Sequence, residues 1–379
     1  MQTPSLWQVL WQALQDGETM AIATVVRSEG STPRPAGASL LLRPHGAVVG
    51  AVSGGCVEAD LLEAAAEVIA SGRAQQRRYA AADSEDPFSI GLTCGGSLEV
   101  VIEPIDPGAA APVLAALAAA IQADQPALLV SRAAGPQAWR LLSAQGATGS
   151  LGQPDLDAAA DAAWLQIGAD QTTTAGAEWP SRAWIDEHGL VMRLHQPRPP
   201  FWIIGAIDGA AALAQLARQL GFRVTVVDAR ATFATAERFP MADAVVCEWP
   251  DSWMAEQGIG NTTVIAVLTH DPKFDIPVLS IALRSPAAYV GAMGSRRTNE
   301  DRLQRLRQAG LGEAELRRLR APIGLDLGGR SAEAMAVAIV AEIVMLRHGG
   351  TGLPLCERSG PIHPDAALSP SRPCSSSSA

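Results

Sequence analysis

The sequence predicts an α/β protein with two folded domains, and two patterns carry that prediction. Up to about residue 105, strand-like runs alternate with glycine turns around helical stretches, which is typical of a small α+β domain. From Phe201 onward, continuous apolar runs alternate with helical runs, as a parallel sheet covered by helices on both faces requires. The second domain is therefore predicted to be Rossmann-like, and 379 residues suffice for both domains.

Charge and apolar content exclude two classes of partner. The chain has 29 basic and 39 acidic side chains, a formal charge of −10, whereas nonspecific binding to nucleic acid or to an anionic membrane needs a basic surface. No apolar run approaches the roughly 20 residues that span a bilayer, and the first residues lack the pattern of a secretory leader. We therefore expect neither nucleic acid nor membrane as a partner.

The cysteines favour a cytoplasmic protein with reduced thiols. They stand at positions 56, 94, 247, 356 and 374, are widely spaced, and form no C-x-x-C pair. A disulfide framework or a zinc cluster would need closer and more regular spacing. Reduced thiols are the ordinary state of cysteine in the cytoplasm.

The first predicted domain, residues 1–105, opens with a helix and continues with strands and one longer helix. That second helix follows from the helical spacing of Val57, Leu61, Ala65 and Val68, and Gly72 should end it. The predicted strands are Met20–Arg27, Ala38–Leu42, the run HGAVVGAVSGG, and Ser97–Pro104.

The stretch SGGCVE places a cysteine between a glycine turn and the second helix. Gly54 and Gly55 let the backbone approach a ligand, and the N–H groups at a helix start attract an anion. Cys56 would then be a reactive thiolate stabilised by the helix dipole, an effect that Glu58 opposes. A small residue in a tight strand-to-helix turn explains the same pattern, and the local sequence does not decide between the two.

Two further loops have a similar composition. Cys94 precedes Gly95 and Gly96 at the start of a strand. If both cysteine turns lie at one sheet edge, the two thiols could face one soft ligand. Ser31 and Arg34 lie in the loop RSEGSTPRPAG, where hydroxyls and a guanidinium suit a phosphate or a polar heterocycle. A solvated turn is the simpler alternative for that loop.

Residues 106–197 carry no chemical motif. An alanine-rich helix leads to short strand candidates among polar loops, so this segment is predicted to be scaffold or a small β extension of the first domain. The proline-rich run His195–Pro200 is predicted to be a stiff linker, because each proline fixes φ and removes a donor.

The predicted Rossmann-like domain, residues 198–363, departs from the dinucleotide fingerprint in its first turn. Gly205 is present, but Ile207 replaces the glycine that admits a pyrophosphate, and Asp208 adds a negative charge. Asp228 ends the second strand, where an acid often holds a ribose. Conventional NAD(P) binding is therefore disfavoured.

Later loops of this domain carry other polar groups. His270 and Asp271 follow a strand at the sheet edge where such folds bind ligands, although one His–Asp pair is weak evidence for acid–base chemistry. An anion cradle before a helix, or else an exposed basic turn, is formed by Gly294, Ser295, Arg296 and Arg297. The low-complexity tail, residues 364–379, is predicted to be disordered.

Several long motifs occur in the order typical of one family. The chain resembles the N-terminal signature of the XdhC/CoxI family in VVRSEGSTPRPAGASLLL, SGGCVEADLLEAA and GLTCGGSLEVVIEP. It resembles the C-terminal Rossmann domain of that family in VTVVDARATFATAERFP, LTHDPKFD, YVGAMGSRRT and PIGLDLGGRSAEAMAVAIVAEI. The resemblance covers residues from about 15 to 105 and 198 to 363. Members are accessory proteins that mature molybdenum hydroxylases such as xanthine dehydrogenase and carbon monoxide dehydrogenase.

The resemblance implies a chaperone without turnover of its own. Such a protein binds molybdenum cofactor, protects it while a cysteine desulfurase installs the terminal sulfido ligand, and delivers it to a client hydroxylase. Cys56 or Cys94 would be a thiolate near molybdenum, and the arginine-bearing loops would hold the pterin phosphate. The implied cofactor-binding residues in the first domain are Ser31, Arg34, Gly54, Gly55, Cys56, Glu58, Cys94, Gly95 and Gly96. A homodimer is expected to cover the exposed cofactor.

Two other functions fit parts of the sequence. An NAD(P)-dependent oxidoreductase would use the Rossmann-like domain, and Ile207 argues against it. A pure protein–protein adaptor would leave the two cysteine turns unexplained.

Overall fold

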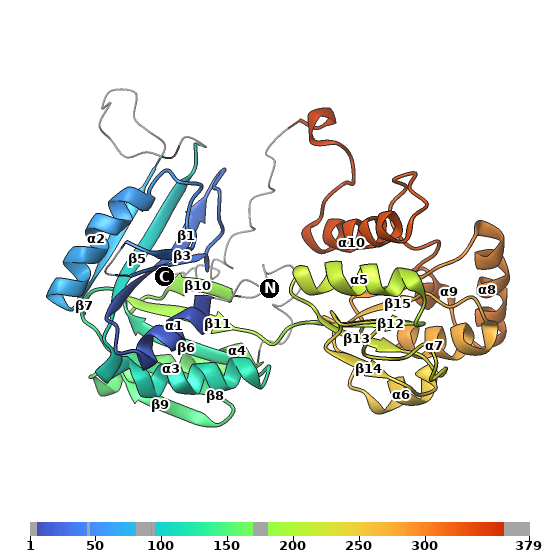
Figure 1. Cartoon of the computed structure of the whole chain (residues 1–379), viewed down its shortest axis with the longest axis horizontal. Coiled ribbons are helices and arrows are strands. Elements are labelled where there is room, and N and C mark those ends of the chain that lie inside the picture. The colour runs from blue at the N-terminus through green and yellow to red at the C-terminus, as the bar shows by residue number, and fades with distance from the viewer. Residues whose placement is uncertain (1–5, 44–45, 81–91, 93–94, 170–180, 360–379) are drawn as a thin grey trace, which may run out of the picture. The chain divides into compact units, whose positions relative to one another are not determined.

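A computed structural model describes residues 6–43, 46–80, 92, 95–169 and 181–359 (Figure 1). The described chain divides into two compact units, the first up to Pro197 together with residues 355–359, the second from Arg198 to Pro354. The first mixes helices with antiparallel sheets and the second has a parallel sheet, so the predicted fold class is confirmed. The tail beyond residue 359 lies outside the described residues.

The first unit holds two antiparallel sheets and the helices that cover them. Its helices are α1 (Leu6–Gln15), α2 (Glu58–Ser71), α3 (Pro107–Gln122) and α4 (Pro154–Ala169). One sheet has the strand order β3 (Val48–Gly50), β2 (Ser39–Leu42), β1 (Met20–Glu29), β5 (Ser97–Ile105), β4 (Arg73–Tyr79) and β7 (Gly135–Pro136). The other has the order β10 (Ser181–Ile185), β11 (Leu190–His195), β6 (Ala127–Arg132), β8 (Trp139–Ser143) and β9 (Gly146–Ser150).

Strand β1 separates two cores because its side chains alternate between the faces of the sheet. Ala23 and Val25 pack with α2, whereas Met20 and Ile22 pack with α1 and α3. The helical face predicted for α2 is buried at all of its positions, and Gly72 ends the helix in the left-handed conformation, φ 64°. Both expectations for α2 are therefore confirmed.

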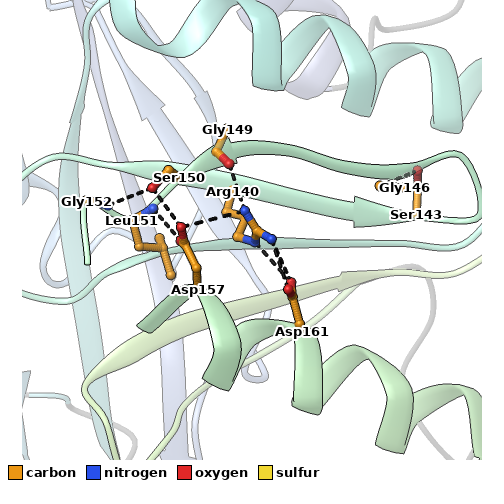
Figure 2. Close-up of polar contacts among 9 residues, drawn as sticks. All are labelled: Arg140, Ser143, Gly146, Gly149, Ser150, Leu151, Gly152, Asp157 and Asp161. Carbon is orange, nitrogen blue, oxygen red and sulfur yellow. Dashed lines mark hydrogen bonds and ion pairs between the residues drawn. The ribbon is translucent and has the colours of Figure 1, made fainter. Parts of the chain in front are cut away.

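Helix α4 lies in the part of residues 106–197 after the alanine-rich helix, where strands and loops were expected. Its composition is mostly alanine and aspartate, so the apolar signal in the sequence is weak. Leu156 and Ile167 pack on the neighbouring sheet, and polar contacts also hold the helix to the strands (Figure 2). Arg140 on β8 donates to both carboxylate oxygens of Asp161 at 2.9–3.0 Å and to the carbonyl of Gly149. Asp157 accepts from the Ser150 hydroxyl and the Leu151 N–H, each at 2.7 Å. Strand β4, RAQQRRY, was likewise not predicted, because it is largely polar.

A buried ion pair joins the two sheets of the first unit. Arg193 on β11, 4% exposed, pairs with Glu103 on β5, which is fully buried. The guanidinium also donates to the Ser131 hydroxyl at 2.8 Å and to the Thr24 hydroxyl at 3.2 Å. Gln137 donates to Glu103 at 3.1 Å. The sheet built from residues 127–195 is thus fastened to the sheet of the first hundred residues by a polar network.

The second unit is a doubly wound parallel sheet. Its strands lie in the order β14 (Ala244–Val246), β13 (Arg223–Val227), β12 (Pro200–Ile204), β15 (Val264–Val267), β16 (Tyr289–Ala292) and β17 (Leu319–Arg320). Its helices are α5 (Asp208–Gln219), α6 (Pro250–Glu256), α7 (Pro272–Arg284), α8 (Arg296–Gln308), α9 (Glu313–Leu316) and α10 (Ala332–His348). A 3₁₀ turn, Leu355–Glu357, comes next in the chain and belongs to the first unit. In chain order the strands run 3-2-1-4-5-6, the arrangement of dinucleotide-binding folds.

The strands of the second unit are apolar on both faces, as predicted. Phe201 and Ile203 of β12 pack with α5 and α10, whereas Trp202 and Ile204 pack with α6, α7 and α8 (Figure 1). Ser331 caps α10 by accepting from the Ala334 N–H. Among the described residues, no helix is long and apolar enough to cross a membrane.

We predict that Arg193→Met lowers the free energy of unfolding by about 3–5 kcal/mol, because the Glu103 carboxylate is left buried without its counter-charge. The double variant Arg193→Met/Glu103→Leu should recover most of that loss. Urea denaturation of both variants and the wild type measures the difference. A double variant no more stable than the single one would contradict a role for the uncompensated charge.

Candidate functional site

A pocket of about 550 Å³ lies in the first unit, within the size range of small-molecule sites. The α1 helix, the loop before β2, the end of β3 and strands β10 and β11 contribute its walls. Its lining consists of Leu6, Trp7, Arg34, Gly37, Ala38, Ser39, Gly50, Ala51, Arg182, Ala183 and Arg193. Gly50 must be glycine here, because its φ is 94° and a Cβ would lie 2.3 Å from the Ser39 carbonyl oxygen.

The pocket concentrates positive charge in an acidic protein. Three arginines line it and no carboxylate does, although the chain as a whole has a formal charge of −10. Arg34 and Arg182 are exposed, so their guanidiniums can bind a ligand at low desolvation cost. The Arg193 guanidinium forms an ion pair with Glu103, and burial lowers the pKa of this guanidinium. The arrangement is suited to an anionic ligand.

A hydrogen-bond chain connects the buried ion pair to the pocket. Arg193 donates to the Thr24 hydroxyl, which lies 3.2 Å from the hydroxyl of Ser39 in the pocket lining. The side chain of Arg193 also lies over the Trp139 ring, 5.6 Å from its centroid. These contacts fix the orientation of Arg193, so its charge is a rigid part of the pocket wall.

Sequence reasoning found Arg34 but missed Arg182 and Arg193. Arg34 stood out because it lies in a loop rich in hydroxyls and turn residues. The other two lie on β10 and β11, in a region without motifs. The available signal was an arginine inside the apolar run LVMRLH, a position where a charge needs a buried partner.

The cysteine turn before α2 supplies its own anion. The N–H groups of Gly55 and Val57 donate to the Glu58 carboxylate at 3.0 and 3.3 Å, and the Cys56 N–H donates to the Ser53 hydroxyl at 3.1 Å. Ser53 also hydrogen-bonds to Glu58 through its hydroxyl and its N–H. These donors, which an external anion would need, are therefore already engaged.

The thiol of Cys56 lies on the surface of this turn. Gly54, Gly55 and Cys56 are exposed, whereas Val57 behind them is fully buried. The helix itself begins at Glu58, two residues after the cysteine. What this turn presents to a ligand is the sulfur atom and a glycine backbone.

The second cysteine turn is described only in part. Cys94 lies outside the described residues, so the predicted meeting of the two thiols stays a prediction. Gly96 packs against the loop that carries Ser31: a Cβ on Gly96 would lie 2.4 Å from the Ser31 carbonyl oxygen and 2.7 Å from that of Glu29. Gly96 thus allows close packing against the RSEGSTPRP loop, and Ser31 itself is exposed.

The first turn of the parallel sheet is also bound by a carboxylate of the chain itself, that of Asp228. The Ala206 N–H donates to the Asp228 carboxylate at 2.8 Å, and Arg230 binds the same carboxylate through its side chain. Burial alone would raise the pKa of Asp228, but these hydrogen bonds hold it below its ordinary value. Gly205 has φ 110° and packs on Thr269. The carboxylate predicted to hold a ribose is thus bound to the first turn of its own sheet and to Arg230.

In the other loops of the second unit, the predicted site residues lie where helices begin. Asp271 caps α7 by accepting from the Lys273 N–H and pairs with the Lys273 ammonium at 3.1 Å, while His270 is exposed. The helix α8 starts at the predicted cradle formed by Gly294, Ser295, Arg296 and Arg297, with Ser295 as its cap. Among the described residues, no group of three or more His, Cys, Asp or Glu could hold a metal ion.

The fold is that of a two-unit protein whose second unit has the strand order of a Rossmann domain. Family models place it further: the model described as "XdhC and CoxI family" matches residues 13–80, and the one described as "XdhC Rossmann domain" matches residues 201–343. The two matches together cover more than half of the chain. The chain belongs to the XdhC and CoxI family, as its motifs predicted.

Curated relatives and a solved structure agree with this membership. The chain is 28% identical to the molybdenum cofactor insertion chaperone PaoD of Escherichia coli, over 89% of this chain and 86% of that protein. It is 28% identical to a probable xanthine dehydrogenase subunit of Bacillus subtilis, over 88% of this chain and 95% of the relative. A crystal structure described as a xanthine dehydrogenase from Bacillus halodurans has the same fold, with TM-score 0.68 and 23% identity over 89% of this chain and 94% of that one.

We predict that Glu58→Gln lowers the free energy of unfolding by about 1 kcal/mol at neutral pH, as loss of a helix cap does. Burial would raise the pKa of Glu58, but hydrogen bonds from Ser53 and nearby N–H groups hold it below its ordinary value. The stabilisation is therefore present above the ordinary pKa and is lost as pH falls through the lowered one. Denaturation between neutral and acid pH tests this, with Glu63→Gln, exposed on the same helix, as the control. A deficit that does not shrink in acid would contradict it.

A titration of NADH fluorescence should show no saturable binding at micromolar concentrations. The N–H that would bind the pyrophosphate is engaged by Asp228, and Ile207 stands where the fingerprint has glycine. Saturable micromolar binding would instead revive the oxidoreductase alternative.

Proposed function

We propose that this protein is a molybdenum-cofactor chaperone that holds the cofactor in the pocket of its first unit, protects it during sulfuration, and delivers it to a molybdenum hydroxylase. Its family membership and its relatives support a role in maturation of molybdenum enzymes. The cofactor is cargo rather than a resident group. The reaction centre therefore belongs to the client, and no turnover by this chain is required.

The observation that carries the proposal is the charge of the pocket. A molybdopterin has a flat heterocycle and a terminal phosphate, so its site needs an apolar face and fixed cations. Arg34, Arg182 and Arg193 supply the cations, and Trp7 supplies an aromatic face. The space of about 550 Å³ is sufficient for a ligand of this class. The residues present therefore fit the proposed cargo.

The three arginines have different tasks in this proposal. Arg34 and Arg182 are exposed side chains that can close on a phosphate and release it again. Arg193 cannot move without breaking its pair with Glu103, so it is a fixed positive wall that orients the ligand. A carrier needs both properties, because it must bind its cargo and then give it up.

In this proposal the Cys56 thiol lies near the molybdenum atom of the bound cofactor and binds or shields it. Its N–H is fixed by Ser53 while its side chain is exposed, so a soft metal can approach the thiol. The cysteine desulfurase, the homodimer and a cytoplasmic location are further parts of the proposal. They follow from the resemblance and the composition rather than from the geometry.

We predict that Arg34→Gln/Arg182→Gln, purified from a host that makes molybdenum cofactor, retains at least tenfold less pterin than the wild type. Each lost charge-assisted contact weakens binding by about 1.5–3 kcal/mol. The readout is the pterin content of the full-length protein, together with its molybdenum content. The control is Arg78→Gln, which removes one exposed positive charge on β4, outside the pocket.

The same preparation separates the roles of thiol and pocket. Cys56→Ser should keep the pterin and lose the ability to protect the sulfido ligand, read as activity of a reconstituted hydroxylase. Pterin absent from the wild type as well would overturn the carrier function. Pterin retained equally by all variants would overturn the assignment of the pocket.

A further inference from the structure

Helix α8 in the second unit carries, in its middle, a buried arginine with unused donors. Arg302 is 3% exposed, and its Nη2 donates to the Asp275 carboxylate and to the Met293 carbonyl, each at 2.8 Å. Its Nε and Nη1 are buried and have no hydrogen-bond partner among the described residues. Buried donors without acceptors destabilise a fold and are rare in native proteins. This position therefore calls for an acceptor that the chain itself does not supply.

The unused donor faces the turn between β16 and α8. A Cβ on Gly294 would lie 3.4 Å from Arg302 Nη1 and 3.3 Å from the Thr298 side chain, so a larger residue would cover the guanidinium. Gly294 has φ 150°, a backbone conformation that also favours glycine. The Arg302 guanidinium therefore lies next to the backbone of the turn at Gly294.

The same turn has open backbone donors and positive charge. Ser295 caps α8 by accepting from the Thr298 N–H, and Asn299 donates to the Ser295 carbonyl. The N–H groups of Arg296 and Arg297 have no acceptor within the described part of the chain, as is usual in the first turn of a helix. Both of these side chains are exposed guanidiniums. A 13-residue helix adds its dipole to these groups.

The turn between β12 and α5 shows that an anionic group binds the N–H groups of such a turn. At the β12–α5 turn, the Ala206 N–H is already occupied by the Asp228 carboxylate. Asp208 in the first turn of α5 is paired with Arg238 at 2.9 Å. No carboxylate of the described chain fills the β16–α8 turn in the same way. Both turns lie at the carboxyl ends of parallel strands, the edge where this fold binds ligands.

We propose that the β16–α8 turn is a phosphate-binding site, with Arg302 as the buried donor and the N–H groups of Arg296 and Arg297 as the cradle. Asp275 balances the charge of Arg302, so the attraction for an anion comes from the helix start and the exposed arginines. The phosphate group can be free or esterified, since the turn recognises its oxygens. The site is independent of the proposed pterin pocket, because its residues all belong to the second unit.

Calorimetric titration of the full chain with inorganic phosphate tests the site. The titration is done in the Arg34→Gln/Arg182→Gln variant at constant ionic strength, so that the pocket of the first unit contributes nothing. We expect saturable binding that Arg302→Lys weakens about tenfold, because lysine keeps a charge beside Asp275 but loses the second donor. Arg296→Gln should weaken binding several-fold. Arg305→Gln, an equal change at an exposed position further along α8, should leave it within twofold.

A parallel titration with adenosine 5′-monophosphate separates the two sources of phosphate. Tighter binding of the ester, still dependent on Arg302, supports the site and assigns it to a phosphate ester. Equal or weaker binding of the ester, with phosphate binding dependent on Arg302, supports the site and assigns it to free phosphate. Absence of saturable binding for both probes overturns the site, as does binding that neither Arg302→Lys nor Arg296→Gln changes. If Arg302→Lys does not fold, the exposed Arg296→Gln decides alone.

Discussion

The ion pair between Arg193 and Glu103 is the buried polar contact that joins the two sheets of the first unit, and it acts beside an apolar core that also spans them. Removing two charges from water is costly, and the surrounding hydroxyls of Thr24 and Ser131 offset that cost by satisfying the guanidinium. An apolar contact could hold the sheets together equally well. The ion pair adds a rigid positive charge at the wall of the pocket, which an apolar contact could not provide.

Glycine-rich turns in this protein do not all have the same role. At the start of α2 and at the β12–α5 turn, a carboxylate of the chain occupies the N–H groups that attract anions in related folds. The N–H groups of these turns are therefore already bound to a carboxylate of the chain. The pocket of the first unit differs because no carboxylate lines it beside the exposed Arg34 and Arg182. The β16–α8 turn differs because no carboxylate of the described chain accepts from its N–H groups. The positions of the chain's own carboxylates thus decide which turns keep donors for an external anion.

Much of the second unit could be predicted from the sequence, because strands that are buried on both faces are continuous apolar runs bounded by glycines and caps. The α2 helix was predictable for a similar reason, since its buried positions repeat at helical spacing. Strand β4 was not, because its sequence is largely polar and gives no apolar alternation. Helix α4 was not either, because alanine and aspartate fill most of its positions, although Leu156 and Ile167 pack on the neighbouring sheet.

The candidate site was only partly predictable. Loops around Ser31, Arg34 and Cys56 stood out by composition, and Arg34 does line the pocket. The two arginines on β10 and β11 could not be assigned to it, because their neighbours are set by long-range strand pairing. Nor could the sequence show that Glu58 and Asp228 would turn back onto their own glycine turns, since that depends on side-chain geometry.

The pocket draws its walls from residues 6–51 and from residues 182–193, with more than a hundred residues between them. During synthesis the chain emerges in order, so an early nascent chain has Arg34 but neither Arg182 nor the β11 strand that holds Arg193. The pocket cannot form until the ribosome has made nearly all of the first unit. A chain that ended before residue 182 would therefore keep Arg34 but lack two of the three arginines that line this pocket.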